Sequence, residues 1–341
     1  MLLTFEVGFA KKVAKRSAFI VATDYVEADG KTDVAERLQK LVDDNPNRTI
    51  YFPDGIYLLS HSIMTPADPT KAVHLVLSNF ATMKAADGWA QDGGALVRLG
   101  GKLPYNSIEL NGSNYGIEGG IFDGSGVADG ISIESGRETR INHVSIKHVQ
   151  VGIHIKHGAN SGSSDSDIID VNIVGNEKEN SIGVLVEGYD NTFTNMRIAS
   201  VHVGVWCKTG GNSFKNIHPL FRRCPDYVTS CGFIVEQSNN WLDYCYSDQF
   251  ATGFKLGKNA CCNLTDCFVW WYNGKVPAQT AIECDGKLES FVRSIHVGFK
   301  SECTNVALLK AEKGGKGMLD NTYMHRHELS PEDVSEAYSK K

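Results

Sequence analysis

The chain has 341 residues, a formal net charge of −6 and 42% hydrophobic residues. The negative charge argues against nucleic acid or an anionic membrane as the main partner, and no apolar run reaches the roughly 18 residues that a membrane-spanning helix needs. The 34 glycines against 9 prolines fit a turn-rich β protein with ample apolar material for a core.

The N-terminal segment MLLTFEVGFAKKVAKRSAF does not have the pattern of a signal peptide. Glu6 and the basic cluster Lys11–Arg16 interrupt the apolar run that such a peptide needs. The expected location is therefore cytoplasmic, with a secreted mature form as the open alternative.

Residues 24–60 are expected to form an N-terminal cap helix and the first strands. An apolar stripe with helical spacing ends at Asn45-Pro46. A strand is predicted from Thr49 to Ser60, with a turn at Pro53-Asp54-Gly55. The residues of the stripe are Val34, Leu38, Leu41 and Val42.

The segment ADGKTDVAERLQKLVDDNPNRTIYFPDGIYLLS, residues 28–60, resembles the opening of the pectate-lyase-like superfamily. In that superfamily a helix introduced by Asp is followed by a strand with the pattern v-x-F-P-x-G-x-Y. The resemblance implies an all-β fold, a right-handed parallel β-helix whose N-terminal end is covered by the helix. It concerns the fold and carries no catalytic residue.

Residues 105–312 contain an internal repeat that predicts the same fold independently. FTNMRIASVHVGVWCKTG (193–210) aligns without a gap with INHVSIKHVQVGIHIKHG (141–158), 52 positions earlier. Apolar residues recur at every second position, which favours stacked β-strands over helical repeats. Other copies begin at Ile117, Ile168, Phe214, Leu242, Leu264 and Phe291.

A solenoid grows by adding coils, so we expect a single domain over residues 1–341. The C-terminal residues 328–341 are expected to form a short helix or tail, with Ser330 at the N-cap position and Pro331 in the first turn.

Aligned repeats stack one above another at about 4.8 Å in a parallel β-helix, so they can be read as rows on a surface. One row alternates in charge and is expected to set the register of the coils: Glu134, Lys156, Glu187, Lys208, Glu236, Gly257, Asp285 and Lys310. Another row is expected to mark a bend between strands: His143, Asp170, Asn195, Asn216, Tyr244, Asp266 and Arg293.

Two adjacent outward rows collect the chemistry suited to a sugar site. The first is Ser145, Asn172, Arg197, His218, Tyr246 and Phe268, and the second is Asp123, Lys147, Val174, Ala199, Leu220, Asp248 and Trp270. Two excursions interrupt the coils beside them, at 221–231 and 272–280. Loops on a rigid scaffold are where function usually lies.

Cleavage or transfer of a glycosidic bond needs two carboxyl groups about 5 to 10 Å apart. We take Asp248 as the first and Asp243 or Asp226 as its partner, with His218 or Tyr246 sharing proton transfer. The chain is thus predicted to be a carbohydrate-active enzyme of the glycoside hydrolase or fructotransferase-like kind. The predicted substrate-binding residues are Arg197, Trp270, Trp271, Arg222 and Arg223.

Two alternatives stay open. Eliminative cleavage of a uronide needs a cation to neutralise the carboxylate and a base to take the α-proton, which the arginines and Tyr246 or His218 could supply. A non-catalytic glycan-binding or assembly module would use the same face, because Phe268, Trp270 and Trp271 also suit a subunit interface.

The expected partners are a carbohydrate and further copies of the chain. Other β-helix proteins, such as inulin fructotransferases, work as trimers with the site between subunits, so a homotrimer is the oligomer considered. No cofactor or metal is expected, with Ca²⁺ at SGSSDSD (161–167) as a minor alternative.

Overall fold

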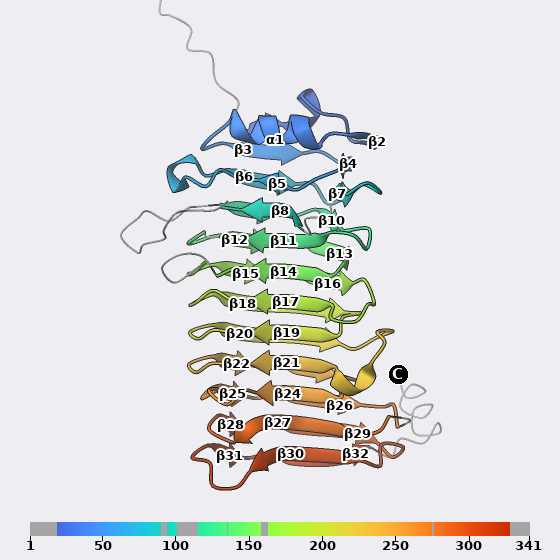
Figure 1. Ribbon diagram of the computed structural model, residues 1–341, viewed down its shortest axis with the longest axis vertical. Coiled ribbons are helices and arrows are strands. Elements are labelled where there is room, and N and C mark those ends of the chain that lie inside the picture. The colour runs from blue at the N-terminus through green and yellow to red at the C-terminus, as the bar shows by residue number, and fades with distance from the viewer. Residues whose placement is uncertain are drawn as a thin grey trace, which may run out of the picture.

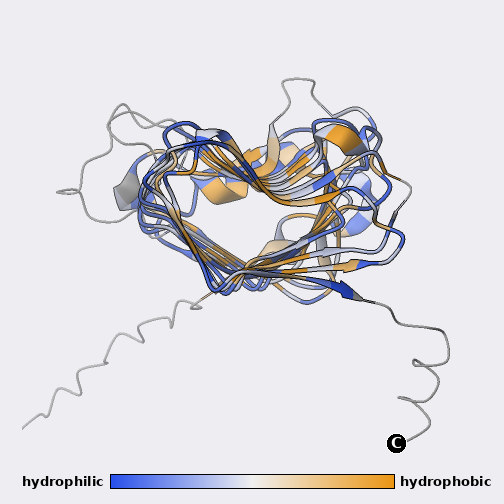
Figure 2. Cartoon of the chain, turned by 90° about the horizontal axis from the view of Figure 1, so that it is seen from below, coloured by the Kyte–Doolittle hydropathy of each residue, from blue (hydrophilic) through white to orange (hydrophobic). Residues whose placement is uncertain are grey.

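The computed structural model describes residues 19–89, 94–100, 115–134, 136–157, 163–274 and 276–327. Strands of successive coils pair in parallel and stack into one column (Figure 1). Seen along the stack, the coils lie over one another (Figure 2). The parallel β-helix predicted from the repeats is therefore confirmed.

Each coil contributes strands to three faces, of which the first two belong to one 22-stranded sheet and the third is a 10-stranded sheet. The first face comprises β1 (Phe19–Val21), β3 (Thr49–Phe52), β6 (His74–Leu77), β9 (Gly116–Glu118), β12 (Arg140–Asn142), β15 (Asp167–Ile169), β22 (Trp241–Asp243), β25 (Asn263–Thr265), β28 (Phe291–Arg293) and β31 (Met318–Asp320). The second comprises β2 (Asp29–Asp33), β4 (Gly55–Leu59), β7 (Ala81–Ala85), β10 (Ile121–Asp123), β13 (Ser145–Val149), β16 (Asn172–Gly175), β23 (Tyr246–Asp248), β26 (Phe268–Trp271), β29 (His296–Lys300) and β32 (Tyr323–His327).

Two long strands, β18 (Thr192–Ala199) and β20 (Ser213–Leu220), run through both of these faces. The third face comprises β5 (Ile63–Met64), β8 (Ala95–Leu99), β11 (Asp129–Ile133), β14 (Val151–Ile155), β17 (Ile182–Val186), β19 (Val203–Cys207), β21 (Cys231–Val235), β24 (Thr252–Leu256), β27 (Gln279–Lys287) and β30 (Val306–Glu312). Short 3₁₀ helices lie at Ala22–Asp24, Pro69–Lys71 and Tyr227–Thr229.

The helix α1 (Ala35–Asp43) covers the first coil, as predicted (Figure 1). All four residues of the predicted apolar stripe are buried beneath it. The Asp33 carboxylate accepts hydrogen bonds from the backbone N–H groups of Ala35 and Ser60, at 3.1 and 3.2 Å. Asp33 therefore joins the start of the helix to the end of β4. The predicted C-terminal helix, residues 328–341, lies outside the described residues.

Apolar side chains point inward and stack between coils, because equivalent residues of parallel strands lie directly above one another. On the first face the stacked residues are Ile141, Ile168, Phe193, Phe214, Leu242, Leu264 and Val292, all buried. The last copy of the repeat is thus in register from Val292, one residue later than the sequence alignment placed it.

The predicted bend between the first two faces is confirmed, and its residues adopt a left-handed backbone. Asn195 and Asn216 both have φ of 55°. Their amides form a ladder in which Asn216 Nδ2 donates to Asn195 Oδ1 at 2.9 Å, and Asn195 Nδ2 donates to Asp170 Oδ1 at 3.0 Å. The prediction for Arg293 is wrong, because the one-residue shift puts Ser294, with φ of 53°, at the bend.

Tyr244 occupies this bend with φ of 54° and a 61% exposed side chain. Asparagine tolerates left-handed backbone better than tyrosine does, and a new amide here would donate to Asn216. Tyr244→Asn is expected to raise the free energy of unfolding by about 1 kcal/mol and the melting temperature by roughly 2 °C. Tyr244→Gln, which gains no such backbone preference, should not stabilise the protein in the same melting experiment.

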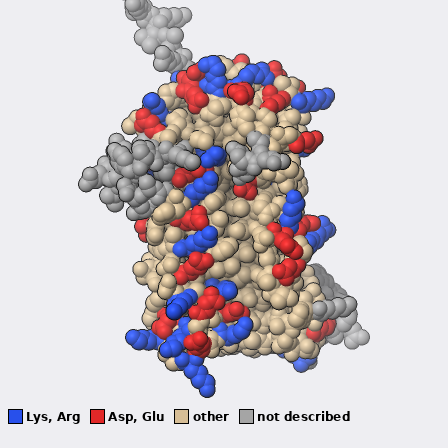
Figure 3. All heavy atoms as spheres, in the orientation of Figure 1, with Lys and Arg blue, Asp and Glu red and all other residues tan. Residues whose placement is uncertain are grey.

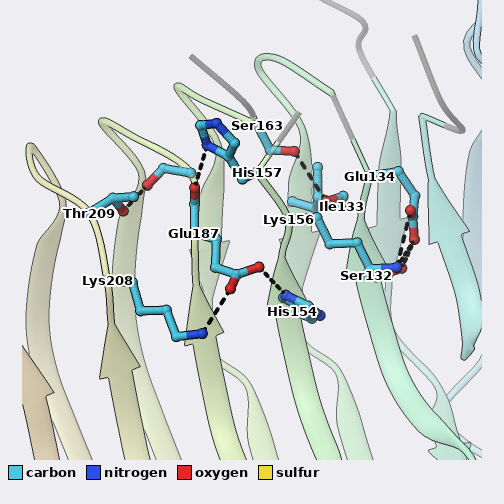
Figure 4. A network of polar contacts seen from close by, with 11 residues as sticks. Ser132, Ile133, Glu134, His154, Lys156, His157, Ser163, Glu187, Lys208 and Thr209 are labelled. Atoms are coloured by element: carbon cyan, nitrogen blue, oxygen red, sulfur yellow. Dashed lines mark hydrogen bonds and ion pairs between the residues drawn. The ribbon is translucent and has the colours of Figure 1, made fainter. Parts of the chain in front are cut away.

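The alternating charge row lies along the third face and is confirmed from Glu134 to Asp285. Lys156 Nζ lies 2.9 Å from Glu134 Oε1, and Lys208 Nζ lies 2.9 Å from Glu187 Oε1 (Figure 4). Lys310 was placed wrongly, because it pairs with Glu283, two residues before Asp285. In Figure 3 charges of both signs run down the left side of the visible face, and further charges lie along its right side, with a largely uncharged strip between them.

No helix in the described part of the chain is long and apolar enough to cross a membrane.

Candidate functional site

Five aromatic rings form a stack along the outside of the second face. They are His218, Tyr246, Phe268, His296 and Tyr323, at equivalent positions of β20, β23, β26, β29 and β32. Successive ring centroids are 4.0, 4.8, 4.8 and 4.6 Å apart. The stack combines apolar ring faces with imidazole and phenol groups, and its first two members are predicted site residues.

Asp248 lies at the start of this stack. Its Oδ1 accepts a hydrogen bond from Gln249 Nε2 at 3.0 Å, and its Oδ2 lies 3.6 Å from His218 Nε2. That nitrogen is buried and has no hydrogen-bond partner. A separation of 3.6 Å is too long for a hydrogen bond, but catalytic contacts often tighten when substrate binds. Asp248 and His218 are thus brought together as predicted.

Tyr246 completes this cluster, with its ring at 22° to that of His218. Burial, together with the negative charge of Asp248 and its hydrogen bond, raises the pKa of Tyr246 well above its ordinary value of 10. The phenol therefore stays protonated near neutral pH.

The three predicted arginines come from two parts of the chain. Arg197 is next to His218 in register, on the adjacent strand, and its Nη1 lies 3.2 Å from the Met196 carbonyl oxygen. Arg222 and Arg223 lie on the 221–231 excursion and are exposed. Both line a pocket of about 200 Å³ that Gln249, the partner of Asp248, also lines.

The predicted pairing of Asp248 with Asp243 or Asp226 stays a prediction. Asp243 ends β22 on the first face, where it pairs in register with Lys215, and the left-handed bend separates it from Asp248. Asp226 lies in the excursion and accepts a hydrogen bond from Thr229 Oγ1 at 2.6 Å. No hydrogen bond joins either residue to Asp248 in the described part of the chain.

The two tryptophans have opposite orientations. Trp270 lies in the same outward row as Asp248, with its ring 6.3 Å from that of Phe268. Trp271 is fully buried, and its Nε1 donates to the Phe250 carbonyl oxygen at 2.6 Å. The prediction that Trp271 contacts substrate or a second subunit is therefore wrong, since side chains alternate along β26.

A larger pocket, of about 770 Å³, was not predicted. It lies where the second face turns into the third, and Arg222 and Arg223 reach it from the excursion. Its other charged residues are Lys84, Asp87, Asp123, Glu177 and Lys178, and His148 also lines it. The predicted row showed only Asp123 beside Lys147, and the structure adds Lys84 on the other side of Asp123.

Among the described residues, no group of three or more His, Cys, Asp or Glu side chains is arranged to hold a metal ion. The segment considered for Ca²⁺ is described only from Ser163 onward, and its Asp165 forms an ion pair with Arg137. Calcium binding there stays a prediction.

No model of a known protein family and no curated protein matches the sequence. Solved structures do match. A tailspike protein mutant of E. coli bacteriophage HK620 in complex with a hexasaccharide superposes with a TM-score of 0.70, at 10% identity, over 91% of this chain and 63% of the tailspike. The alginate lyase from Paenibacillus sp. str. FPU-7 gives 0.61 at 14% identity, over 86% of this chain and 99% of the lyase.

The chain has the fold of the pectate-lyase-like β-helix proteins. The A-module of the Azotobacter vinelandii mannuronan C-5 epimerase AlgE6 also superposes on this β-helix, with a TM-score of 0.60 at 14% identity, over 92% of this chain and 96% of the module. A Geobacillus virus E2 protein, ORF18, gives 0.56 at 14% identity, and the chain spans 61% of its length. The resemblance seen in residues 28–60 is thus confirmed for the fold, and several of the similar structures are named as carbohydrate-active proteins.

Proposed function

We propose that the chain cleaves a uronate-containing polysaccharide by elimination, with His218 as the base and Tyr246 as the acid. The observation that carries the proposal is the position of the His218 ring. It stacks on Tyr246 at 4.0 Å while its Nε2 lies 3.6 Å from the Asp248 carboxylate. One imidazole, one protonated phenol and one carboxylate are thereby brought into a single cluster.

Elimination can be built from the two outward rows alone, whereas hydrolysis would need Asp243 or Asp226 from outside them. Hydrolysis requires a second carboxyl group within about 10 Å of the first. In the two outward rows between Arg197 and Gly298, all of them described, Asp248 is the only carboxylate. Elimination needs instead a base, an acid and a cation.

The residues can divide the reaction as follows. The His218 imidazole takes the proton α to the uronate carboxylate on the ring nitrogen that does not face Asp248, and Asp248 orients the imidazole and compensates its new charge. The C–H electron pair passes into the carboxylate, beside which Arg197 supplies positive charge. The pair then forms the C=C bond, the C–O bond to the neighbouring sugar breaks, and the leaving oxygen takes the proton of Tyr246.

The names of two similar structures, an alginate lyase and a mannuronan C-5 epimerase, support a first screen on polyuronates. The purified protein would be given polymannuronate, polygalacturonate and neutral glycans. We expect the ultraviolet absorbance of unsaturated uronate to rise together with new reducing ends. Reducing ends without absorbance would show hydrolysis and overturn elimination, and tight binding with neither signal would indicate a non-catalytic glycan-binding module.

Asp248 acts through His218 and is therefore a positioning residue. Asp248→Asn is expected to lower kcat by about 10²-fold and leave KM nearly unchanged, because the imidazolium formed in the reaction loses its counter-charge. Steady-state kinetics on the best polyuronate would measure this. Asp243→Asn and Asp226→Asn serve as controls, and a comparable loss of kcat in either would instead restore the paired-carboxylate mechanism.

A further inference from the structure

The pocket of about 770 Å³ lies several coils before Asp248, where the second face turns into the third. The ends of β7, β10, β13 and β16 form its floor, together with the turns that follow them. Ser125, Asn176 and Ser200 add hydroxyl and amide groups, and no aromatic residue other than His148 lines it. Such a lining is suited to a hydroxyl-rich ligand.

Most acidic groups of the pocket are already engaged. Asp123 Oδ1 accepts from the Ser125 N–H at 2.9 Å and lies 2.9 Å from His148 Nδ1. Glu177 Oε1 accepts from Ser200 Oγ at 3.4 Å and lies 3.7 Å from Arg223 Nη1.

The cations are less completely paired. No ion pair is formed by Lys84 or Arg222 within the described residues, and Lys178 Nζ donates only to the Gly126 carbonyl oxygen, at 3.3 Å. Four Lys or Arg side chains against Asp87, Asp123 and Glu177 leave one excess positive charge, although the whole chain carries −6. The pocket is therefore a local site for an anionic group.

The pocket also continues toward the proposed reaction centre. Arg222 and Arg223 line both this pocket and the smaller one, which Gln249 shares, and Gln249 donates to Asp248. Asp123 and Asp248 lie in the same row, five coils apart, which is about 24 Å at strand spacing. Only a ligand of several sugar units would reach both.

We infer that this pocket is a distal subsite for an acidic polysaccharide, where one uronate carboxylate several sugars from the cleaved bond meets Lys84 and another meets Arg222. The inference rests on the proposed function for its substrate class. It adds that affinity depends on the length of the oligomer, because only a long one reaches this pocket from Asp248.

The test is Lys84→Gln, with Lys215→Gln on the exposed first face as the matched control. Binding would be measured by calorimetry with size-fractionated oligomers of mannuronate and of galacturonate, and with neutral mannose oligomers. We expect Lys84→Gln to weaken binding of long acidic oligomers about fivefold, to leave short ones unchanged, and to reduce the salt dependence of binding. Lys215→Gln should change none of these.

Calorimetry keeps the two proposals separate, because it does not require turnover. Weaker binding of long acidic oligomers to Lys84→Gln supports the subsite even if no unsaturated product ever forms. Equal binding by both variants and the parent protein, equal effects on long and short oligomers, or no binding of either acidic series would overturn it.

Discussion

Replacing His218 by glutamine should lower kcat/KM on polyuronates by about 10²- to 10⁴-fold, the usual contribution of a general base. Glutamine keeps a polar side chain of similar length but cannot take the α-proton. The loss should appear in kcat, because Arg197 and the remaining rings of the stack still bind the substrate. Initial rates of unsaturated uronate formation would measure it.

The matched control is His157→Gln. His157 is an exposed histidine that follows β14, and its Nδ1 lies 3.3 Å from the Glu187 carbonyl oxygen. Its replacement should leave activity unchanged. Equal melting temperatures of the two variants would show that both are folded. If His218→Gln keeps the parent rate, the base lies elsewhere and the proposed mechanism fails.

Replacing Glu134 by glutamine should lower the free energy of unfolding by about 3 kcal/mol. The Glu134 side chain is 4% exposed and lies 2.9 Å from both Arg98 Nε and Lys156 Nζ. Removing its charge leaves two poorly exposed cations without their common anion, and breaking a buried ion pair costs about 3–5 kcal/mol. Chemical denaturation at neutral pH would measure the change.

The same carboxylate predicts how stability depends on pH. Burial alone would raise the pKa of Glu134, but hydrogen bonds from Arg98, Ser132 and Lys156 outweigh it and lower the pKa from 4.5 to about 2. Its stabilisation is thus complete above about pH 4.5 and is lost as the pH falls toward 2. This lowering of the pKa of Glu134 corresponds to about 3 kcal/mol of folding stability.

Glu283→Gln is the control for both measurements. Glu283 lies on the same face and pairs with Lys310 at 3.2 Å, but the lysine side chain is 68% exposed. Such a pair contributes at most about 1 kcal/mol. The role of Glu134 would be contradicted if the two variants unfolded at the same denaturant concentration. It would also be contradicted if the Glu134→Gln variant lost as much stability as the parent protein between pH 4.5 and 2.

Strand periodicity was enough to predict the faces of the β-helix and most of its rows. Side chains alternate with a period of 2, so one correctly aligned residue per coil fixes the orientation of all the others. This is why Arg197, His218, Tyr246 and Asp248 lie together as predicted. The same alternation places Trp271 inside, because it directly follows Trp270, which points outward.

The other errors, and the positions that no row could predict, lie where coil length changes. The long strand β27 has an irregular register near Lys287, which the alignment crossed when it placed Lys310. Asp226 and the two arginines lie on an excursion, and the repeat gives no register for residues outside it. The pocket around Lys84 combines turn residues from four coils, such as Gly126 and Lys178, which no row contained.

The charge row on the third face has the same two-coil period as the gapless repeat of 52 residues. Ile168 lies between Ile141 and Phe193 in the stack, so this repeat covers two coils, and it aligns Lys156 with Lys208 across the intervening Glu187. Inserting a single coil would place like charges side by side, whereas a pair of coils preserves the alternation. The unit by which this scaffold can be lengthened or shortened is therefore the coil pair.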